Sequence, residues 1–442
     1  MSAHSIMHGA NDKLGGPCAP RAVVNTSVGR PRAERTAHLF SDMNSNHYSV
    51  SPRPLLYGAL LLLVGAASSA REHVPLTVPF QKFSQTLIAS ADLREKSYIV
   101  VPVTLQTGPD ELLIGMKRGD AHARDREAVF EINAYQPSTG RMQGRRASLG
   151  EPLHTYYNGE FVRHANGTIS CFVDVQQGSA VVRLGLREAR STDGGRTFSA
   201  PRRVGLIDGV EYGYVFDSVV RSGRTYMLAM RFANLAGGKA LHPRWPHAGS
   251  VDVLVSDDQG GSWRFFRDLT AEFGGHPINE SALVPWRDGW ILACRGYDNR
   301  QWLVRTDGNF RPLVQRNLTA DFDCINSMVG RPRLYQRDGR HYLVGRNWTQ
   351  PLAANARSPM QLCWFRFSPE TLALETCVVL DNAERSNVVD GYYATAHWRE
   401  RDGVVLLNIL TYKRADFVPE QKLKSFHDPD LIRLEFVWDE IK

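Results

Sequence analysis

From Arg71 to the C-terminus, apolar and polar residues alternate in short runs that are rich in valine, leucine, tyrosine and tryptophan. Glycine, aspartate and asparagine interrupt these runs, and almost no stretch keeps the period of an amphipathic helix. Alternation with a period of two is typical of strands that bury one face. The pattern therefore predicts an all-β chain after residue 70.

One unit recurs along this region, a turn that ends in glycine and is followed by an apolar strand. The six turn glycines are spaced by 59, 56, 66, 50 and 64 residues, at Gly108, Gly167, Gly223, Gly289, Gly339 and Gly403. A repeat of this length with several strands per unit is typical of a β-propeller. We predict one domain over residues 71–442, a six-bladed β-propeller of four-stranded antiparallel blades. The alternative is a pair of β-sandwiches whose turns are similarly spaced by chance.

The fourth repeat holds the first candidate site residues. A carboxylate, Glu280, precedes an apolar strand, the turn Asp288-Gly289 and a second strand that ends in Arg295. Because the turn sets the register of a hairpin, Glu280 and Arg295 should lie level at the end opposite the turn. Such a pair fits either a site for an anionic or polyhydroxyl ligand or a surface ion pair.

Residues 53–70 have a basic start, an apolar run and a small-residue end, which predicts a signal peptide cleaved after Ala70. The run of about 16 apolar or small residues is short for a membrane span, which needs about 20. We therefore expect a secreted or periplasmic protein without stable membrane association; an uncleaved anchor is the alternative. Because Met43 lies at a normal distance from the apolar run, we assign 43–70 to the signal and 1–42 to a spurious or disordered leader.

Charge and cysteine content limit the classes of function that the chain is expected to have. Beyond residue 70 the chain holds 47 Lys and Arg against 43 Asp and Glu, a dispersed excess without a basic block. Nucleic-acid binding is therefore not suggested. No CxxC or HExxH pattern occurs, and we predict neither metal nor other cofactor. Five cysteines follow Arg71, so at least one thiol is free; a disulfide between Cys363 and Cys377 across a predicted hairpin is one option.

Two turns share the pattern S-x-D-x-G-x-[ST]-aromatic, at residues 191–198 and 256–263. Serine and aspartate can bond the turn amides, glycine permits a positive φ, and the aromatic ring fills the gap between sheets. This pattern resembles the Asp-box (BNR repeat) of the sialidase superfamily, and the resemblance covers roughly residues 95–435. In that family these turns lie away from the active site, so Asp193 and Asp258 are expected to be structural.

The resemblance also implies a mechanism. Sialidases of this kind use a tyrosine nucleophile, a glutamate that deprotonates it, an aspartic acid/base and three arginines that hold the sugar carboxylate. Glu280 and Arg295 match the glutamate and one arginine, because the family's glutamate also precedes a strand, an Asp-Gly turn and a strand ending in arginine. Tyr393, followed by a small residue ahead of the last turn, matches the nucleophile, with Tyr392 as the alternative.

Other positions match less well. The acid/base is assigned to Asp125 in the loop after the first blade's second strand, with Asp120 as the alternative, and His122 is a candidate proton-transfer group or ligand donor. Val100 stands where the family has its first arginine; Lys117, Arg118 or His122 could compensate. The third arginine is Arg346 or Arg357, and Arg331 and Arg333 are further candidates.

These assignments imply an exported exo-glycoside hydrolase that releases a terminal sialic acid or a related acidic sugar from a glycan. Two alternatives stay open, because Val100 removes one expected carboxylate ligand. One is a glycan-binding propeller without catalysis. The other is a hydrolase or lyase that acts on a different sugar.

Overall fold

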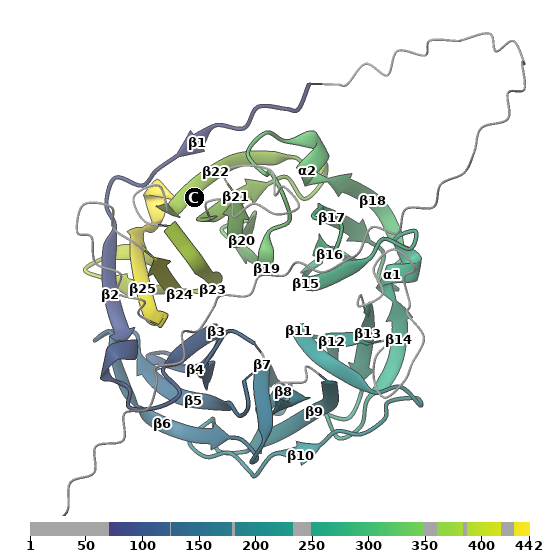
Figure 1. Cartoon of the computed structure of the whole chain (residues 1–442). Helices are drawn as coiled ribbons and strands as arrows, with labels where there is room; N and C mark the ends of the chain where they lie inside the picture. The colour runs from purple at the N-terminus through teal and green to yellow at the C-terminus, as the bar shows by residue number, and fades with distance from the viewer. Residues whose placement is uncertain are drawn as a thin grey trace, which may run out of the picture. The chain divides into compact units, whose positions relative to one another are not determined.

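Six β-sheets stand around a common axis and make up nearly all of the regular structure (Figure 1). The computed structural model describes residues 70–123, 125–178, 182–232, 249–348, 360–382, 387–416 and 428–442. Among these residues no helix is long and apolar enough to cross a membrane. The predicted six-bladed β-propeller is confirmed.

The first four blades follow one another along the chain, and each is a four-stranded antiparallel sheet numbered outward from the axis. The first blade contains β3 (Tyr98–Gly108), β4 (Glu111–Gly119), β5 (Val129–Gln136) and β6 (Arg141–Leu149). The second contains β7 (His154–Arg163), β8 (Ile169–Gln177), β9 (Val182–Ser191) and β10 (Arg202–Arg203). The third contains β11 (Tyr212–Arg221), β12 (Arg224–Arg231), β13 (Ser250–Ser256) and β14 (Arg264–Asp268). The fourth contains β15 (Ile278–Trp286), β16 (Gly289–Gly296), β17 (Gln301–Thr306) and β18 (Pro312–Asn317).

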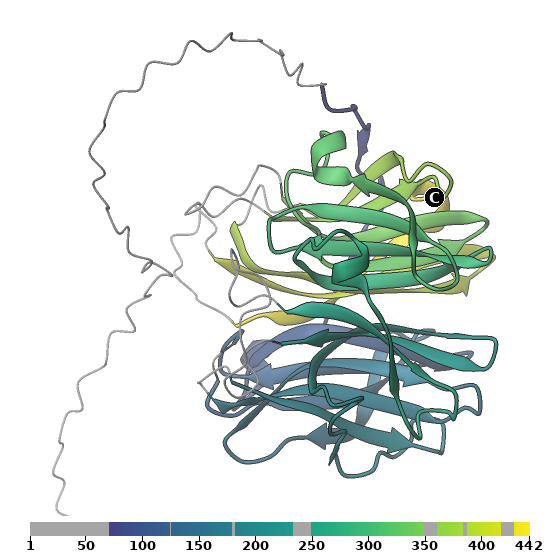
Figure 2. The ribbon, with the colours of Figure 1, turned by 90° about the vertical axis from the view of Figure 1, so that its right-hand side faces the viewer.

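The last two blades also use strands from the N-terminal part. The fifth contains β19 (Gly330–Arg337), β20 (Arg340–Trp348), β21 (Met360–Phe367) and β22 (Leu374–Asn382), and the short β1 (Leu76–Thr77) adds to β22 in parallel. The sixth contains β23 (Asn387–Arg401), β24 (Val404–Asp416) and β25 (Asp430–Val437), with β2 (Phe83–Ile88) as its outer strand. Pairing of β2 with β25 joins the N-terminal part of the propeller to its last blade and so closes the ring. Figure 2 shows the same sheets turned by 90°, with the early blades in blue and the later ones in green and yellow.

Short helices connect some of these strands, namely η1 (Ser90–Asp92), α1 (Leu269–Glu272), α2 (Leu318–Asp321) and η4 (Trp438–Glu440). The predicted glycine turns each join the first two strands of a blade. The two serine–aspartate turns hold the predicted hydrogen bonds: Gly195 N donates to Ser191 Oγ at 2.8 Å and Thr197 N to Asp193 Oδ1 at 3.1 Å. The second turn repeats this pattern with Ser256, Asp258 and Ser262.

The disulfide considered between Cys363 and Cys377 is not formed. All five described cysteines are buried with free thiols. The register of β21 and β22 sets Cys363 opposite Val379 and Cys377 opposite Phe365, so the two are not cross-strand partners. The two cysteines are equally far from the hairpin turn along the sequence. A register shift between the turn and Cys363 nevertheless displaces one strand against the other, so the cysteines do not face each other.

A β-bulge near the start of the inner strand recurs around the ring. In five blades two inner-strand residues oppose a single residue of the second strand, at 101–102, 157–158, 279–280, 331–332 and 392–393. In β11 the register shifts at Gly213. Bulges take residues out of the ladder and re-aim their side chains, and they are common beside active sites. This local irregularity therefore marks one end of the propeller axis.

Three of these bulges hold a non-glycine residue with positive φ, namely Val101 at 57°, Arg331 at 42° and Tyr392 at 64°. Such a conformation costs about 1–3 kcal/mol and persists only where the surrounding structure enforces it. These three residues place backbone strain at the end of the axis where the bulges lie.

Candidate functional site

A cavity of about 170 Å³ lies where the inner strands begin, and we call it the site cavity. The bulges of β7, β15 and β23 contribute side chains that line it, among them Tyr157, Asn158, Glu280 and Tyr393. Other parts of the second and fourth blades add Arg183, Arg295 and Tyr297, and the third blade adds Tyr214. Three residues predicted from the sequence, Glu280, Arg295 and Tyr393, therefore share one cavity although they come from two different blades.

Arg295 joins the other two. Its Nη1 donates to Glu280 Oε2 and, at 2.9 Å, to the hydroxyl oxygen of Tyr393. The hairpin register that the sequence predicted for Glu280 and Arg295 is confirmed, since the bulge residue Glu280 faces Arg295 across β15 and β16. Between the two side chains, both described in full, no direct hydrogen bond joins Glu280 to Tyr393. The guanidinium stands between the predicted base and the predicted nucleophile.

Glu280 is held as a carboxylate. Its Oε2 also accepts from the backbone N–H of Arg331 at 3.0 Å, and its Oε1 accepts from the hydroxyl of Tyr214 at 3.2 Å. Burial acts to raise the pKa of Glu280, but the charges of Arg295 and Arg331 outweigh it and lower that pKa overall. The cavity floor therefore carries a fixed negative charge next to fixed positive ones.

Arg346 is the second guanidinium at Tyr393. Its Nη2 lies 3.4 Å from the Tyr393 hydroxyl, and its guanidinium lies 4.7 Å from the centre of that ring. Arg346 is on β20, the second strand of its blade, as Arg295 is on β16. Within the described part of the chain Arg346 has no ion-pair partner. The alternative arginine, Arg357, lies outside the described residues.

The arginines of β19 lie deeper along the axis. Arg331 donates to the hydroxyl of Tyr214 at 3.1 Å and to the carbonyl of Gly159 at 3.1 Å. Arg333 donates to Glu160, which also accepts from Arg331 at 3.3 Å. Arg331 thus supports the floor of the site cavity, whereas Arg333 faces away from it.

The choice between the two tyrosines follows from their surroundings. Tyr392 is fully buried in the core between the fifth and sixth blades, and its hydroxyl donates to Asp381 at 2.8 Å. Tyr393 lines the site cavity. Of this pair, only Tyr393 is therefore in a position to meet a ligand in that cavity.

The acid/base assignment to Asp125 does not fit this geometry. The Asp125 side chain has 0% exposure, forms an ion pair with Lys117, and accepts from the backbone N–H groups of Asp120 and Ala121 at 2.6 and 2.8 Å. A carboxylate with both oxygens occupied inside a closed loop cannot meet a sugar. Asp125 and Lys117 together shape the loop.

The expected compensation for Val100 is also absent from the described residues. Val100 is buried in an apolar cluster with Tyr393 and Tyr412, where the resemblance places the first arginine. Lys117 forms an ion pair with Asp125, and Arg118 donates to Glu131 at 2.8 Å and to the carbonyl of Glu95 at 2.8 Å. Neither side chain lines the site cavity.

His122 remains from that loop, and it lies beside the cavity. Its Nδ1 is 2.7 Å from Oδ2 of Asp390, and its ring meets the ring of Tyr157 edge-on at 5.8 Å. Asp390 also accepts from the hydroxyls of Tyr98 at 2.9 Å and Tyr412 at 2.8 Å. Burial acts to raise the pKa of Asp390, but His122, Arg346 and Tyr412 outweigh it and bring that pKa to about 2.

Sequence reasoning missed several cavity residues, among them Tyr157, Asn158 and Tyr214, and it also missed Asp390, the partner of His122 beside the cavity. The sequence did contain a pattern that marks most of these positions, a nearly constant distance from the turn glycine. Tyr157, Asn158, Tyr214, Glu280, Arg331 and Tyr393 all stand eight to ten residues before the turn glycine of their own blade. Because each inner strand has a similar length, this offset places all six at the same end of the axis.

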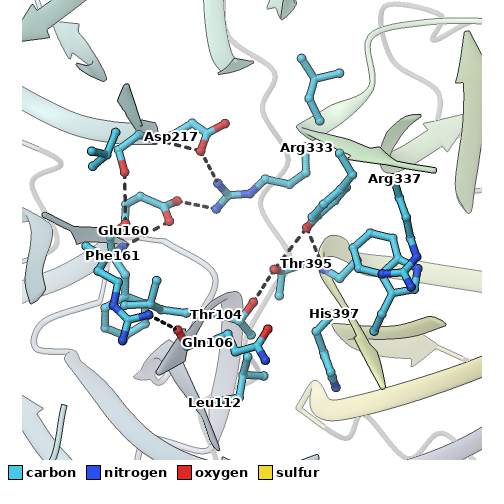
Figure 3. Close-up of a pocket in the computed structure, with 18 residues that line it drawn as sticks. Thr104, Gln106, Leu112, Glu160, Phe161, Asp217, Arg333, Arg337, Thr395 and His397 are labelled. Carbon is cyan, nitrogen blue, oxygen red and sulfur yellow. Dashed lines mark hydrogen bonds and ion pairs between the residues drawn. The ribbon is translucent and has the colours of Figure 1, made fainter. Parts of the chain in front are cut away.

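A second and larger cavity, of about 460 Å³, is lined by the later halves of the inner strands, and we call it the opposite cavity (Figure 3). There Arg333 lies between Glu160 and Asp217, and Thr104 bonds Thr395 at 2.6 Å. Of the described site candidates from the sequence, only Arg333 lines it.

The fold and the site together define a class, a six-bladed β-propeller whose axis ends in a cluster of arginine, tyrosine and carboxylate groups. No family model and no curated protein matches the chain. Among solved structures, a protein of unknown function from Dyadobacter fermentans matches 80% of this chain and 98% of its own, at 14% identity and a TM-score of 0.54. The NanB sialidase of Streptococcus pneumoniae matches 81% of this chain and 71% of its own, at 9% identity and a TM-score of 0.56. At such identities the similarity establishes the fold alone.

Proposed function

We propose that this protein is an exported glycoside hydrolase that releases a terminal acidic sugar, sialic acid or a relative of it, through the site cavity. The observation that carries the proposal is the meeting of Arg295 and Arg346 at the hydroxyl of Tyr393, next to Glu280. Planar guanidinium groups bind carboxylates through paired hydrogen bonds, and Arg346 has no ion-pair partner among the described residues. A sugar carboxylate would complete this arrangement.

The same contacts suggest how the nucleophile is activated. Arg295 separates Glu280 from Tyr393. A substrate carboxylate would draw Arg295 and Arg346 toward itself, and Glu280 would then accept the phenolic proton as the Tyr393 oxygen attacks the anomeric carbon. A neutral tyrosine suits this step because a carboxylate nucleophile would be repelled by the acidic sugar.

A second candidate function is a lyase that acts on a uronic acid. The guanidinium between Glu280 and Tyr393 favours it, since a lyase needs a neutralised carboxylate and a tyrosine but no nucleophilic attack.

The test is turnover of methylumbelliferyl glycosides of sialic acid, glucuronic acid and galactose, together with a uronic-acid polysaccharide. We expect release of the fluorophore from an acidic glycoside and not from the galactoside. Ultraviolet absorbance of an unsaturated uronate, without fluorophore release, would favour the lyase. Binding of an acidic sugar by calorimetry with no turnover would contradict both enzymes and support a glycan-binding propeller.

A further inference from the structure

We propose that His122, held by Asp390, is the general acid and base of the reaction at Tyr393. This assignment rests on the proposed glycosidase function and names the one group that function still lacks. The leaving oxygen of a glycoside needs a proton donor, and Asp125 is closed off in its ion pair with Lys117.

The position of His122 suits the role. Its loop follows β4 in the first blade, and its side chain is 38% exposed, in contrast to 0% for Asp125. The Tyr157 ring connects His122 to the cavity, because it meets the imidazole at 5.8 Å and lines the cavity together with Tyr393. On the other side, Tyr412 bonds Asp390 and packs edge-on against Tyr393 at 6.3 Å between ring centres.

Asp390 determines which nitrogen of His122 is available. A carboxylate only accepts hydrogen bonds, and Asp390 is ionised at neutral pH with its oxygens facing Tyr98, Tyr412 and His122. The Nδ1 of His122 must therefore carry a proton and donate it to this bond. That leaves Nε2 as the nitrogen that can give or take a proton, the arrangement by which an aspartate orients a catalytic histidine.

A histidine also fits the charge of this site better than a carboxylic acid would. The arginines around Tyr393 would favour the ionised form of a carboxyl group, which donates no proton, and an ionised carboxylate would compete with the substrate for Arg295 and Arg346. An imidazole would not compete for these arginines, and Asp390 supplies a negative charge beside it. Around His122 and its Asp390 partner lie the charged and titratable groups Lys117, Asp120, Tyr98, Tyr157, Arg346, Tyr412 and Arg414.

The proton balance is complete. In the first step the Nε2 proton passes to the glycosidic oxygen as its bond to the anomeric carbon breaks and the Tyr393 oxygen bonds to that carbon. In the second step Nε2 takes a proton from water, the water oxygen bonds to the anomeric carbon, and the tyrosyl bond breaks, with Glu280 returning the phenolic proton.

The test compares two substrates of the same acidic sugar, an aryl glycoside whose leaving group needs no proton and an alkyl glycoside whose leaving group does. For His122→Ala we expect kcat/KM on the alkyl glycoside to fall about 10²–10⁴-fold and on the aryl glycoside far less. Added imidazole should restore part of the alkyl-glycoside activity. The pH profile of the variant should lose its alkaline limb, because the wild-type acid is no longer there to deprotonate.

Two further variants keep the test sharp. Asp390→Asn, a positioning residue, should show the same dependence on leaving group with a smaller loss. His73→Ala is the matched control, since His73 Nδ1 also bonds an aspartate, Asp323, at 2.7 Å but far from the cavity; it should behave as wild type. Should His122→Ala fail to fold by circular dichroism, His122→Gln, which can still donate to Asp390, takes its place.

The outcomes separate the two proposals. Equal losses on both substrates, or no loss on either, would overturn the role of His122 while leaving the glycosidase intact. Turnover of neither substrate by the wild-type protein would overturn the proposed function and the role of His122 with it.

Discussion

Each end of the propeller axis holds an arginine beside a buried glutamate, Arg295 with Glu280 at the site cavity and Arg333 with Glu160 at the opposite cavity. At the opposite cavity the arginine is fully paired, since Arg333 lies between two carboxylates, and Asp217 also accepts from the backbone N–H groups of Leu283 and Ser218. At the site cavity Arg346 and the Tyr393 hydroxyl have no carboxylate partner among the described residues.

The pairing of the arginines is a better guide to the functional cavity than cavity volume is. The opposite cavity is the larger, about 460 Å³ against about 170 Å³. A buried guanidinium that is paired with carboxylates is already occupied, whereas one without a carboxylate partner can bind an anionic ligand. We therefore assign the proposed function to the smaller cavity, and two comparisons between the ends and one titration at the opposite cavity test this assignment.

The largest effect should come from the tyrosines of the two cavities. Tyr393→Phe removes the proposed nucleophile and should lower kcat/KM by about 10³-fold or more. Tyr335→Phe, at the opposite cavity, removes a hydroxyl that accepts from the backbone N–H of Ala396 at 2.7 Å and should leave kcat/KM within a few-fold. Steady-state kinetics on the acidic glycoside decide between these outcomes. Similar losses in both variants would mean that the cavities do not differ in function.

Substitution of the two arginines should affect different properties, stability at Arg333 and substrate binding at Arg346. Arg333→Met leaves Glu160 buried without its main partner, which typically costs about 3–5 kcal/mol of unfolding free energy. Arg346→Met breaks no ion pair that the structure describes and should cost far less. It should instead raise KM for an acidic sugar by about 10–100-fold, because charge-assisted hydrogen bonds are worth about 1.5–3 kcal/mol.

Urea denaturation and kinetics on the same two preparations supply both readouts. A large loss of stability in Arg346→Met with unchanged KM would contradict the assignment of this arginine to substrate binding.

The smallest effect concerns the pH dependence of stability at the opposite cavity. Burial raises the pKa of Asp217 to about 6, with Arg333 opposing and Glu160 adding to the rise. Because the folded carboxyl holds its proton more tightly than the unfolded one, its contribution to stability is present below about pH 4 and is lost as the pH rises through 6.

Asp217→Asn should abolish this contribution. Between pH 4 and 6 the wild-type protein should lose on the order of 2–3 kcal/mol more unfolding free energy than the variant. Denaturant titrations at both pH values measure the difference. Parallel pH dependences in the two proteins would show that Asp217 is not perturbed.

The fold was predictable to a large extent because its signals are local. A glycine turn needs only the residues that form it, and strand alternation needs only near neighbours, so six turns at regular spacing predicted six blades. The pair of Glu280 and Arg295 was predictable for the same reason, since one tight turn sets their register. The ring closure by β2 was not, because it joins Phe83 to Glu435 at the other end of the chain.

The site was predictable only in part. Asp125 and His122 are three residues apart in one charged loop, and nothing in their order says which one is buried. Lys117 decides it by pairing with Asp125 inside the loop. Asp390 was overlooked because its partner His122 comes from the first blade, 268 positions earlier in the chain.

The sequence alone therefore determined the repeat, the turns, the strands and the hairpin pair, all of which depend on residues close together in the chain. Tertiary structure decided which side chains meet on the axis. Arg295 and Tyr393 are 98 positions apart, and they touch because bulges in the inner strands turn Glu280 and Tyr393 toward the same point. A bulge changes register by one residue, which strand alternation does not reveal, and ring closure brings the blades around one centre.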